Sequence, residues 1–187
     1  MVIKIIFLSM IMILTSGCIT KKEIQLESLS IIDIKKIEEG YKRKKYIKYN
    51  DRGECILKFK ERRNQLLTTS NKFLRINFTS SEAINLFQDR RAGLYVNLKA
   101  DKKRLEALNF CPLVEVSPKG YHYSYFYPTQ YKIKNEYFQP KEYNDYETFD
   151  LKTIKELKFQ IMTVGYSRWK TNEILITKDM IDRLKYK

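Results

Sequence analysis

An apolar segment at the N-terminus constrains this chain more than any other feature. Lys4 is the only charged residue before Cys18, residues 5–14 are almost all apolar, and small residues follow as far as Gly17. A short positive region, an apolar core and small residues are the three parts of a secretory signal peptide. The apolar run is shorter than the roughly 20 residues that a membrane-spanning helix needs. We therefore expect residues 1–17 to be a cleaved export signal and the remainder to fold outside the cytoplasm.

The stretch Leu14-Thr15-Ser16-Gly17-Cys18 resembles the lipobox of bacterial lipoproteins. In its usual form a Leu stands three residues before the Cys, whereas here Thr15 holds that place and Leu14 lies one residue further back. The resemblance covers residues 1–18 only. It implies cleavage between Gly17 and Cys18, acylation of Cys18 by a palmitate-type lipid, and anchoring to a membrane. The alternative is an ordinary secretory signal followed by a Cys that carries no lipid.

Residue 19 is Ile rather than Asp. By resemblance to lipoprotein sorting in Gram-negative bacteria, this implies the outer membrane, with the protein facing the periplasm. In a Gram-positive organism the anchor would lie in the single cell membrane. We expect residues 18–30, which begin with the polar pair Lys21 and Lys22, to be a lipidated tether. Residues 31–187 are then long enough for one globular extracytoplasmic domain.

The chain is strongly basic, with a formal net charge of +14. Such a charge attracts anionic surfaces and acidic partners. Ile, Lys, Asn and Tyr are abundant together, as in proteins from AT-rich genomes, so composition alone is a competing explanation. The densest basic stretch combines cationic and aromatic residues, a pattern typical of nucleic-acid contact. Export argues against nucleic acid, which leaves a solvated face or a binding surface at Lys42, Arg43, Lys44 and Lys45.

Two cysteines remain if Cys18 is lipidated, namely Cys55 and Cys111. An exported protein folds where disulfides form, and a bridge closing this long loop would stabilise the fold by about 4 kcal/mol. We expect this disulfide, with two separate buried thiols as the alternative. The single His, His122, and the absence of a CxxC motif predict no metal site and no cofactor.

Hydrophobic periodicity predicts an α+β fold with a mainly antiparallel sheet and two to four short helices. Thr79-Ser80-Ser81-Glu82 matches a capping box and predicts a helix over residues 80–92, ended by Gly93. Asp101 is expected to start another helix, and Thr177 with Asp179 a last one. The predicted strands lie at residues 55–59, 74–78, 94–98, 159–164 and 174–176, and two further runs within residues 114–127 flank the turn signal Pro118-Lys119-Gly120.

Four tyrosines alternate along one predicted strand, at Tyr121, Tyr123, Tyr125 and Tyr127. On a strand their rings share one face, and His122 lies on the other. Tyrosine suits contact surfaces because its ring is apolar and its tip polar. This ladder is a candidate binding surface, and a half-buried sheet face is the alternative. His122 is interpreted as an ordinary strand residue.

No catalytic constellation is recognisable in the sequence: a Gly-x-Ser-x-Gly elbow, a phosphate loop and an HExxH motif are all missing. We therefore expect a non-catalytic binding module of the cell envelope, with an acidic protein as partner. The plan of signal, tether and small β-rich domain resembles periplasmic immunity lipoproteins that neutralise secreted toxins. A structural protein that binds anionic envelope polymers is the other alternative.

Overall fold

The computed structural model describes residues 20–42, 68–82, 84, 93–105, 113–118, 120–134, 146–164 and 169–184. Within these ranges the chain forms three sheets and two short helices, α2 (Ile34–Lys42) and α4 (Lys178–Asp182). The predicted mainly β architecture with few helices is confirmed. Cys18, Cys55, Cys111 and the predicted strand at residues 55–59 lie outside the described residues.

One sheet has four antiparallel strands in the order β2-β4-β8-β7. These strands are β2 (Gln25–Asp33), β4 (Lys72–Ser80), β8 (Gly120–Pro128) and β7 (Leu113–Ser117). β7 and β8 form the hairpin that the turn signal at Pro118 and Gly120 predicts. The predicted strands at residues 74–78 and 114–127 are therefore confirmed.

A second sheet has the order β1-β12-β11-β5-β6, with β13 also paired to β11. Its strands are β1 (Thr20–Lys22), β12 (Trp169–Thr171), β11 (Glu156–Val164), β5 (Gly93–Ala100), β6 (Lys103–Arg104) and β13 (Ile174–Thr177). β5 and β13 confirm the strands predicted near residues 94–98 and 174–176. A small third sheet joins β10 (Tyr146–Asp150), β9 (Gln130–Lys134) and β3 (Thr68–Thr69).

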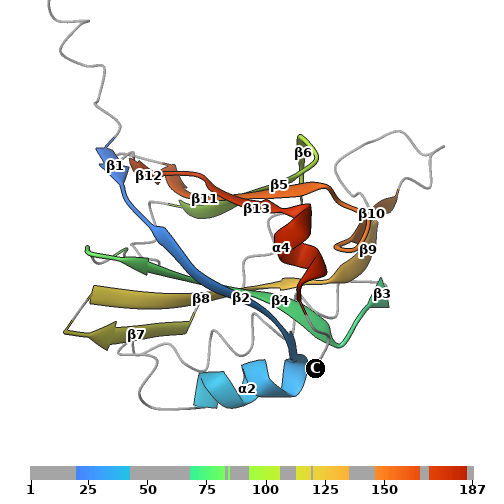
Figure 1. The fold of residues 1–187 in the computed structure, drawn as a ribbon, viewed down its shortest axis with the longest axis horizontal. Coiled ribbons are helices and arrows are strands. Elements are labelled where there is room, and N and C mark those ends of the chain that lie inside the picture. Colours follow the sequence, from blue (N-terminus) through green and yellow to red (C-terminus); the bar gives the residue numbers. More distant parts are fainter. Residues whose placement is uncertain are drawn as a thin grey trace, which may run out of the picture.

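The core lies between the two larger sheets, which Figure 1 shows as stacked layers with α2 on the outer side of the four-stranded sheet. Phe78 of β4 stacks on Tyr123 of β8, with ring centroids 5.0 Å apart. Phe159 of β11 reaches across from the other sheet and lies 5.4 Å from the rings of both Phe78 and Tyr125. On the far side of the four-stranded sheet, Tyr41 of α2 meets Phe126 edge-on at 6.4 Å.

The predicted tether at residues 18–30 is wrong from Thr20 onward, because this segment contributes strands to both large sheets. β1 pairs in parallel with β12, and β2 pairs with β4. The link between β1 and β2 is also held, since the Asn172 side chain accepts the Ile24 N–H at 2.7 Å and donates to the Ile24 carbonyl at 2.9 Å. Lys22 lies over the Trp169 ring, 5.3 Å from its centroid. The segment from Thr20 to Asp33 is therefore part of the folded body.

A helix that begins at Thr79 is also wrong. Thr79 lies inside β4 and pairs with Gln25 on one side and His122 on the other. The hydroxyl of Ser80 accepts the Glu82 N–H at 3.3 Å, so the polar sequence that resembles a capping box ends a strand instead. Residues 83 and 85–92 lie outside the described residues, and Gly93 begins β5.

Asp101 forms a hairpin turn and not the predicted helix start. Ala100 pairs with Lys103, and the two residues between them, Asp101 and Lys102, have φ values of 46° and 73°. Positive φ at both central residues is the signature of a two-residue type I′ turn. The Asp101 carboxylate accepts the N–H groups of Lys155 and Glu156 at 2.9 and 3.0 Å. At the C-terminal end the predicted helix is confirmed as α4, although the Thr177 side chain makes no cap hydrogen bond.

Gly120→Ala should destabilise the protein by about 1–3 kcal/mol, the usual cost of one residue held in a disfavoured backbone conformation. Gly120 has φ +126°, and a Cβ placed on it would lie 2.8 Å from the Ser80 carbonyl oxygen. The free energy of unfolding in urea measures the effect. An unchanged value would show that the β7–β8 turn does not require this conformation.

Lys102→Gly should act in the opposite direction and stabilise the protein by up to about 1 kcal/mol, because Gly relieves the strain of a side chain at φ 73°. Lys103→Gly, one residue later in β6, is the matched control and should lower stability, since Gly weakens a strand. Equal effects of the two substitutions in urea unfolding would contradict the turn assignment.

Candidate functional site

The outer face of the four-stranded sheet carries a row of polar side chains. Because side chains alternate along a strand, burying Ile76 and Phe78 of β4 in the core places Arg75 and Asn77 on the opposite face. The register sets Asn77 opposite Ser124 of β8 on one side and Ser28 of β2 on the other. Three strands that are distant in the sequence thus bring their polar residues together.

A continuous hydrogen-bond network joins these residues. The Nε of Arg75 donates to Asn77 Oδ1 at 2.8 Å and lies 3.2 Å from Ser124 Oγ, and its Nη2 donates to Ser124 Oγ at 3.0 Å. Ser124 in turn donates to Asn77 Oδ1 at 2.7 Å, and Asn77 Nδ2 donates to Ser28 Oγ at 2.8 Å. The network therefore fixes the Nε–Nη2 edge of the guanidinium, and all of its partners there are neutral.

Arg75 has no ion-pair partner in the part of the chain that the structure describes, and its Nη1 makes no hydrogen bond there. A partly buried cation usually has an acidic partner in the fold. Among the described residues, Nη1 of this fixed, planar guanidinium therefore stays available to a ligand. Such a group matches the two oxygens of a carboxylate.

A β-bulge places an acid beside this network. The pairing of β2 with β4 shifts between Leu26 and Ser28, so Glu27 is the extra residue. The shift lets both Leu26 and Leu29 pack against the core, although they are three residues apart. Bulges commonly redirect a side chain in this way. The Glu27 carboxylate lies 3.4 Å from Nδ1 of His122.

His122 connects three strands of the sheet. Its Nε2 lies 3.0 Å from the Ser117 hydroxyl of β7, while Nδ1 faces Glu27 of β2. The order carboxylate, imidazole and hydroxyl is that of a hydrolase triad. Ser117 Oγ also lies 3.3 Å from the Gly120 carbonyl, to which it donates across the hairpin turn. One hydroxyl proton cannot serve both neighbours, so this Ser is not dedicated to the imidazole.

The position of Arg75 argues further against a nucleophilic site at Ser117. Its guanidinium is bonded at Ser124, which pairs with Leu113, whereas Ser117 pairs with Gly120 at the other end of the hairpin. Leu113 and Ser117 are four positions apart along β7, so their Cα atoms are about 13 Å apart. The hydrogen bonds of Arg75 hold its guanidinium at Ser124 and not at Ser117.

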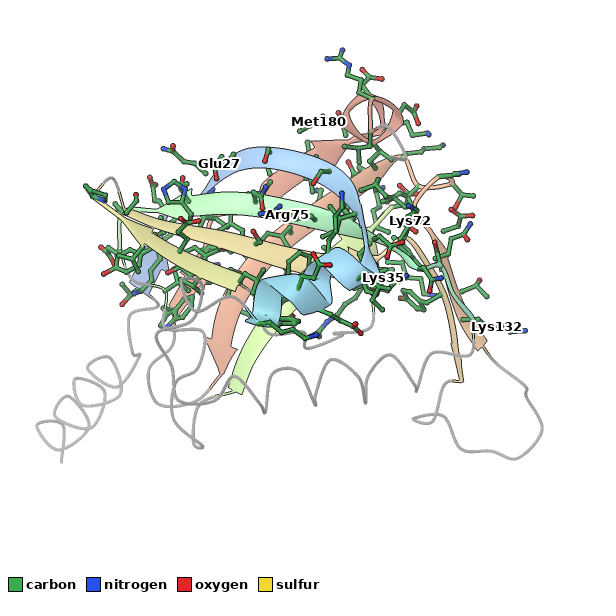
Figure 2. The ribbon with its side chains drawn as sticks, turned by 90° about the horizontal axis from the view of Figure 1, so that it is seen from below. Glu27, Lys35, Lys72, Arg75, Lys132 and Met180 are labelled. Atoms are coloured by element: carbon green, nitrogen blue, oxygen red, sulfur yellow. The ribbon has the colours of Figure 1, made fainter. Side chains whose placement is uncertain are left out.

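Two cavities open over this face and meet at Arg75 and Leu113. The larger, of about 410 Å³, is lined by Glu27, Ser28, Arg75, Asn77, Leu113, Glu115, Ser117, His122, Tyr123 and Ser124. The smaller, of about 240 Å³, extends towards α2 and is lined by Ile32, Lys36, Glu39, Gly40, Arg75, Leu113 and Phe126. Figure 2 views this side of the molecule and shows Arg75 between Glu27 and α2. We call the larger cavity the Arg75 pocket.

The tyrosine ladder faces the core and not a partner. Tyr123, Tyr125 and Tyr127 are each at most 2% exposed, and Tyr121 packs partly buried against the same core. The hydroxyl of Tyr123 accepts the Ile84 N–H at 2.8 Å, and that of Tyr127 donates to Tyr131 at 3.0 Å. The prediction that this face is a binding surface is therefore wrong. The opposite face of β8, with His122 and Ser124, carries the polar pocket instead.

The remaining sequence candidates lie elsewhere. Lys42 is exposed at the end of α2, and Arg43, Lys44 and Lys45 lie outside the described residues, as do Gly17 and the three cysteines. No cluster of His, Cys, Asp and Glu suited to a metal ion occurs among the residues that the structure describes. Over the same residues, no helix is long and apolar enough to cross a membrane. The alternation along β4 was visible in the sequence, but no sequence pattern indicated that Arg75 contacts Ser124.

No protein-family model matches the chain. Searches of curated proteins and of solved structures likewise find no match.

Stability should fall at alkaline pH because of the buried tyrosines. Burial raises the pKa of Tyr125 well above its ordinary value, and burial together with the neighbouring Tyr125 does the same for Tyr41. The folded phenols keep their protons where the unfolded chain loses them, so the stabilisation is complete below pH ~10 and declines as pH rises above it. Urea unfolding at pH 8 and pH 11 measures the loss.

The variant Tyr41→Phe/Tyr125→Phe should lose less stability than the wild type between these two pH values, since it lacks both groups. Comparing the two pH values within each protein removes any constant effect of the substitutions. An equal loss in the two proteins would assign the alkaline effect to other groups, such as the many lysines.

Proposed function

We propose that this protein is a membrane-anchored lipoprotein of the bacterial cell envelope that works as a non-catalytic binding module. The lipobox-type sequence at residues 14–18 supports the anchor, and in a Gram-negative cell the outer membrane facing the periplasm is the proposed place. Only Ile19 separates Cys18 from β1. Acylation of Cys18 would therefore hold the folded body directly at the membrane surface, without a long tether.

The observation that carries the binding role is the state of Arg75. Its guanidinium is fixed by Asn77 and Ser124, lines both cavities, and keeps Nη1 without a partner among the described residues. A cation held rigidly by neutral groups suits recognition, because little side-chain entropy is lost when a ligand binds. Leu113 and Glu115 of β7, the edge strand of the same sheet, line the larger cavity together with Arg75.

A specific protein partner fits this surface better than an anionic polymer. Glu27 and Glu115 line the larger cavity with Arg75, and Glu39 lines the smaller one. A polyanion would be repelled by these carboxylates, whereas a partner that presents matched charges would not. The partner can be an envelope protein or, as in immunity lipoproteins, a secreted toxin. Identifying the captured protein would distinguish these two functions.

Affinity capture with the full-length acylated protein tests this proposal. The bait, purified in detergent, is exposed to envelope extract at low salt and at about 0.15 M salt, where non-specific surface attraction is largely screened. We expect one protein to be retained at the higher salt and Arg75→Met to reduce its retention at least tenfold. Arg104→Met, on exposed β6 of the other sheet, is the matched control and should retain it fully.

Two results would contradict the proposal. The first is retention that disappears at the higher salt for every bound species, which would assign binding to net charge alone. The second is equal retention by the wild type and by a folded Arg75→Met variant, which would place recognition elsewhere. Circular dichroism and the melting temperature establish that the variants are folded.

A further inference from the structure

We infer that the Arg75 pocket takes a short peptide with a free amino group and a free carboxylate, in the size class of a dipeptide. This inference rests on the binding function proposed above and names the chemistry of the ligand. The Arg75 pocket has a volume of about 410 Å³, which lies in the range of about 300–1,000 Å³ that is usual for small-ligand sites. Side chains of both charges line it.

The positive end of the pocket is the Arg75 guanidinium. Hydrogen bonds to Asn77 and Ser124 fix it over the rung of the sheet where these two residues pair. Its Nη1 is without a partner among the described residues, so a ligand carboxylate can accept from it without breaking an ion pair. A guanidinium binds a carboxylate through parallel N–H groups, which also sets the orientation of the ligand.

The negative end is the Glu27 carboxylate, beside His122. The bulge in β2 turns Glu27 towards His122, which pairs with Thr79 on one side and Glu115 on the other. The Glu27 side chain is 48% exposed, so an ammonium group can reach it. A carboxylate in this position binds a protonated amine by a charge-assisted hydrogen bond.

The sheet sets the spacing of the two ends. The Asn77–Ser124 rung and the Thr79–His122 rung are two residues apart along the same face, which corresponds to about 7 Å. A fully extended dipeptide spans about 7 Å at ~3.5 Å per residue. The termini of a dipeptide therefore match the spacing, whereas the amino and carboxyl groups of a single amino acid are too close together.

The same charges exclude other small ligands. A phosphate group would gain from Arg75 but would face Glu27 and Glu115 in the same cavity. A purely cationic ligand would gain from the acids but would be repelled by the fixed guanidinium. Only a ligand with separated charges of both signs satisfies both ends, Arg75 and Glu27, which Figure 2 labels on this side of the molecule.

Isothermal titration of the full-length acylated protein in detergent tests the inference on the wild type. The probes are L-alanyl-L-alanine, its N-acetyl derivative, its C-terminal amide, tetra-alanine and inorganic phosphate. We expect the dipeptide to bind and each of the other four to bind at least tenfold more weakly. Equal affinity for the dipeptide and its two capped forms, or tighter binding of phosphate, would overturn the inference.

Variants then assign the two ends. Arg75→Met should abolish dipeptide binding, and the control Arg104→Met should leave it unchanged. Glu27→Gln should weaken the free dipeptide about tenfold while leaving the weak binding of the N-acetyl form unchanged. A folded Glu27→Gln that weakens both forms equally would contradict the assigned amine site. If Arg75→Met does not fold, the probe series on the wild type still decides.

Failure of this inference is distinguishable from failure of the proposed function. If the capture experiment retains a protein in an Arg75-dependent way while the dipeptide does not bind, the module binds through Arg75 and only the ligand class is wrong. If the dipeptide binds and no protein is captured, the pocket is a small-peptide site and the protein-partner proposal fails. If neither experiment responds to Arg75, both fail.

Discussion

The burial of one face of β4 and β8 against the six-stranded sheet is the contact on which the rest of the structure depends. Phe78 and Tyr123 stack on each other and both sheets close over them through Phe159. An aromatic pair of this kind contributes about 0.5–1.5 kcal/mol beyond its buried area, and truncation of such a Phe costs about 3–5 kcal/mol. Because side chains alternate between the two faces of a strand, burying this face places Arg75 and Asn77 on the outer face of the sheet.

The strands were predictable because alternation of apolar residues is a local pattern. Which face of each strand is buried was not predictable. Residues 74–78 and 120–128 alternate clearly, and both form strands. Along β8, however, one face is all tyrosine and the other mixes Phe126 with His122 and Ser124. Tyrosine is compatible with core and surface alike, so only the pairing with Phe78 and the opposing Phe159 decides which face is buried.

Other features depended on contacts between distant residues. The type I′ turn at Asp101 lacks the Gly that usually marks such turns, and its carboxylate is used by Lys155 and Glu156, more than 50 residues later. The bulge at Glu27 is visible only once β2 is paired with β4. The Arg75 network joins β4 to β8 by three side-chain hydrogen bonds and β4 to β2 by one. No window of sequence contains these partners together.

The energetics of Arg75 explain why the pocket is better understood as a site than as part of the scaffold. A guanidinium that is partly withdrawn from water loses hydration, and neutral acceptors return less than a carboxylate would. Leu113 and Phe126 line the adjoining cavity, so an unbranched apolar side chain such as Met would pack there at no such cost. Residues that serve recognition are often suboptimal for stability. Arg75 lies between the bulge that carries Glu27 and α2, and it has no acidic partner among the residues that the structure describes. A ligand that supplies a carboxylate would explain why a cation is placed here.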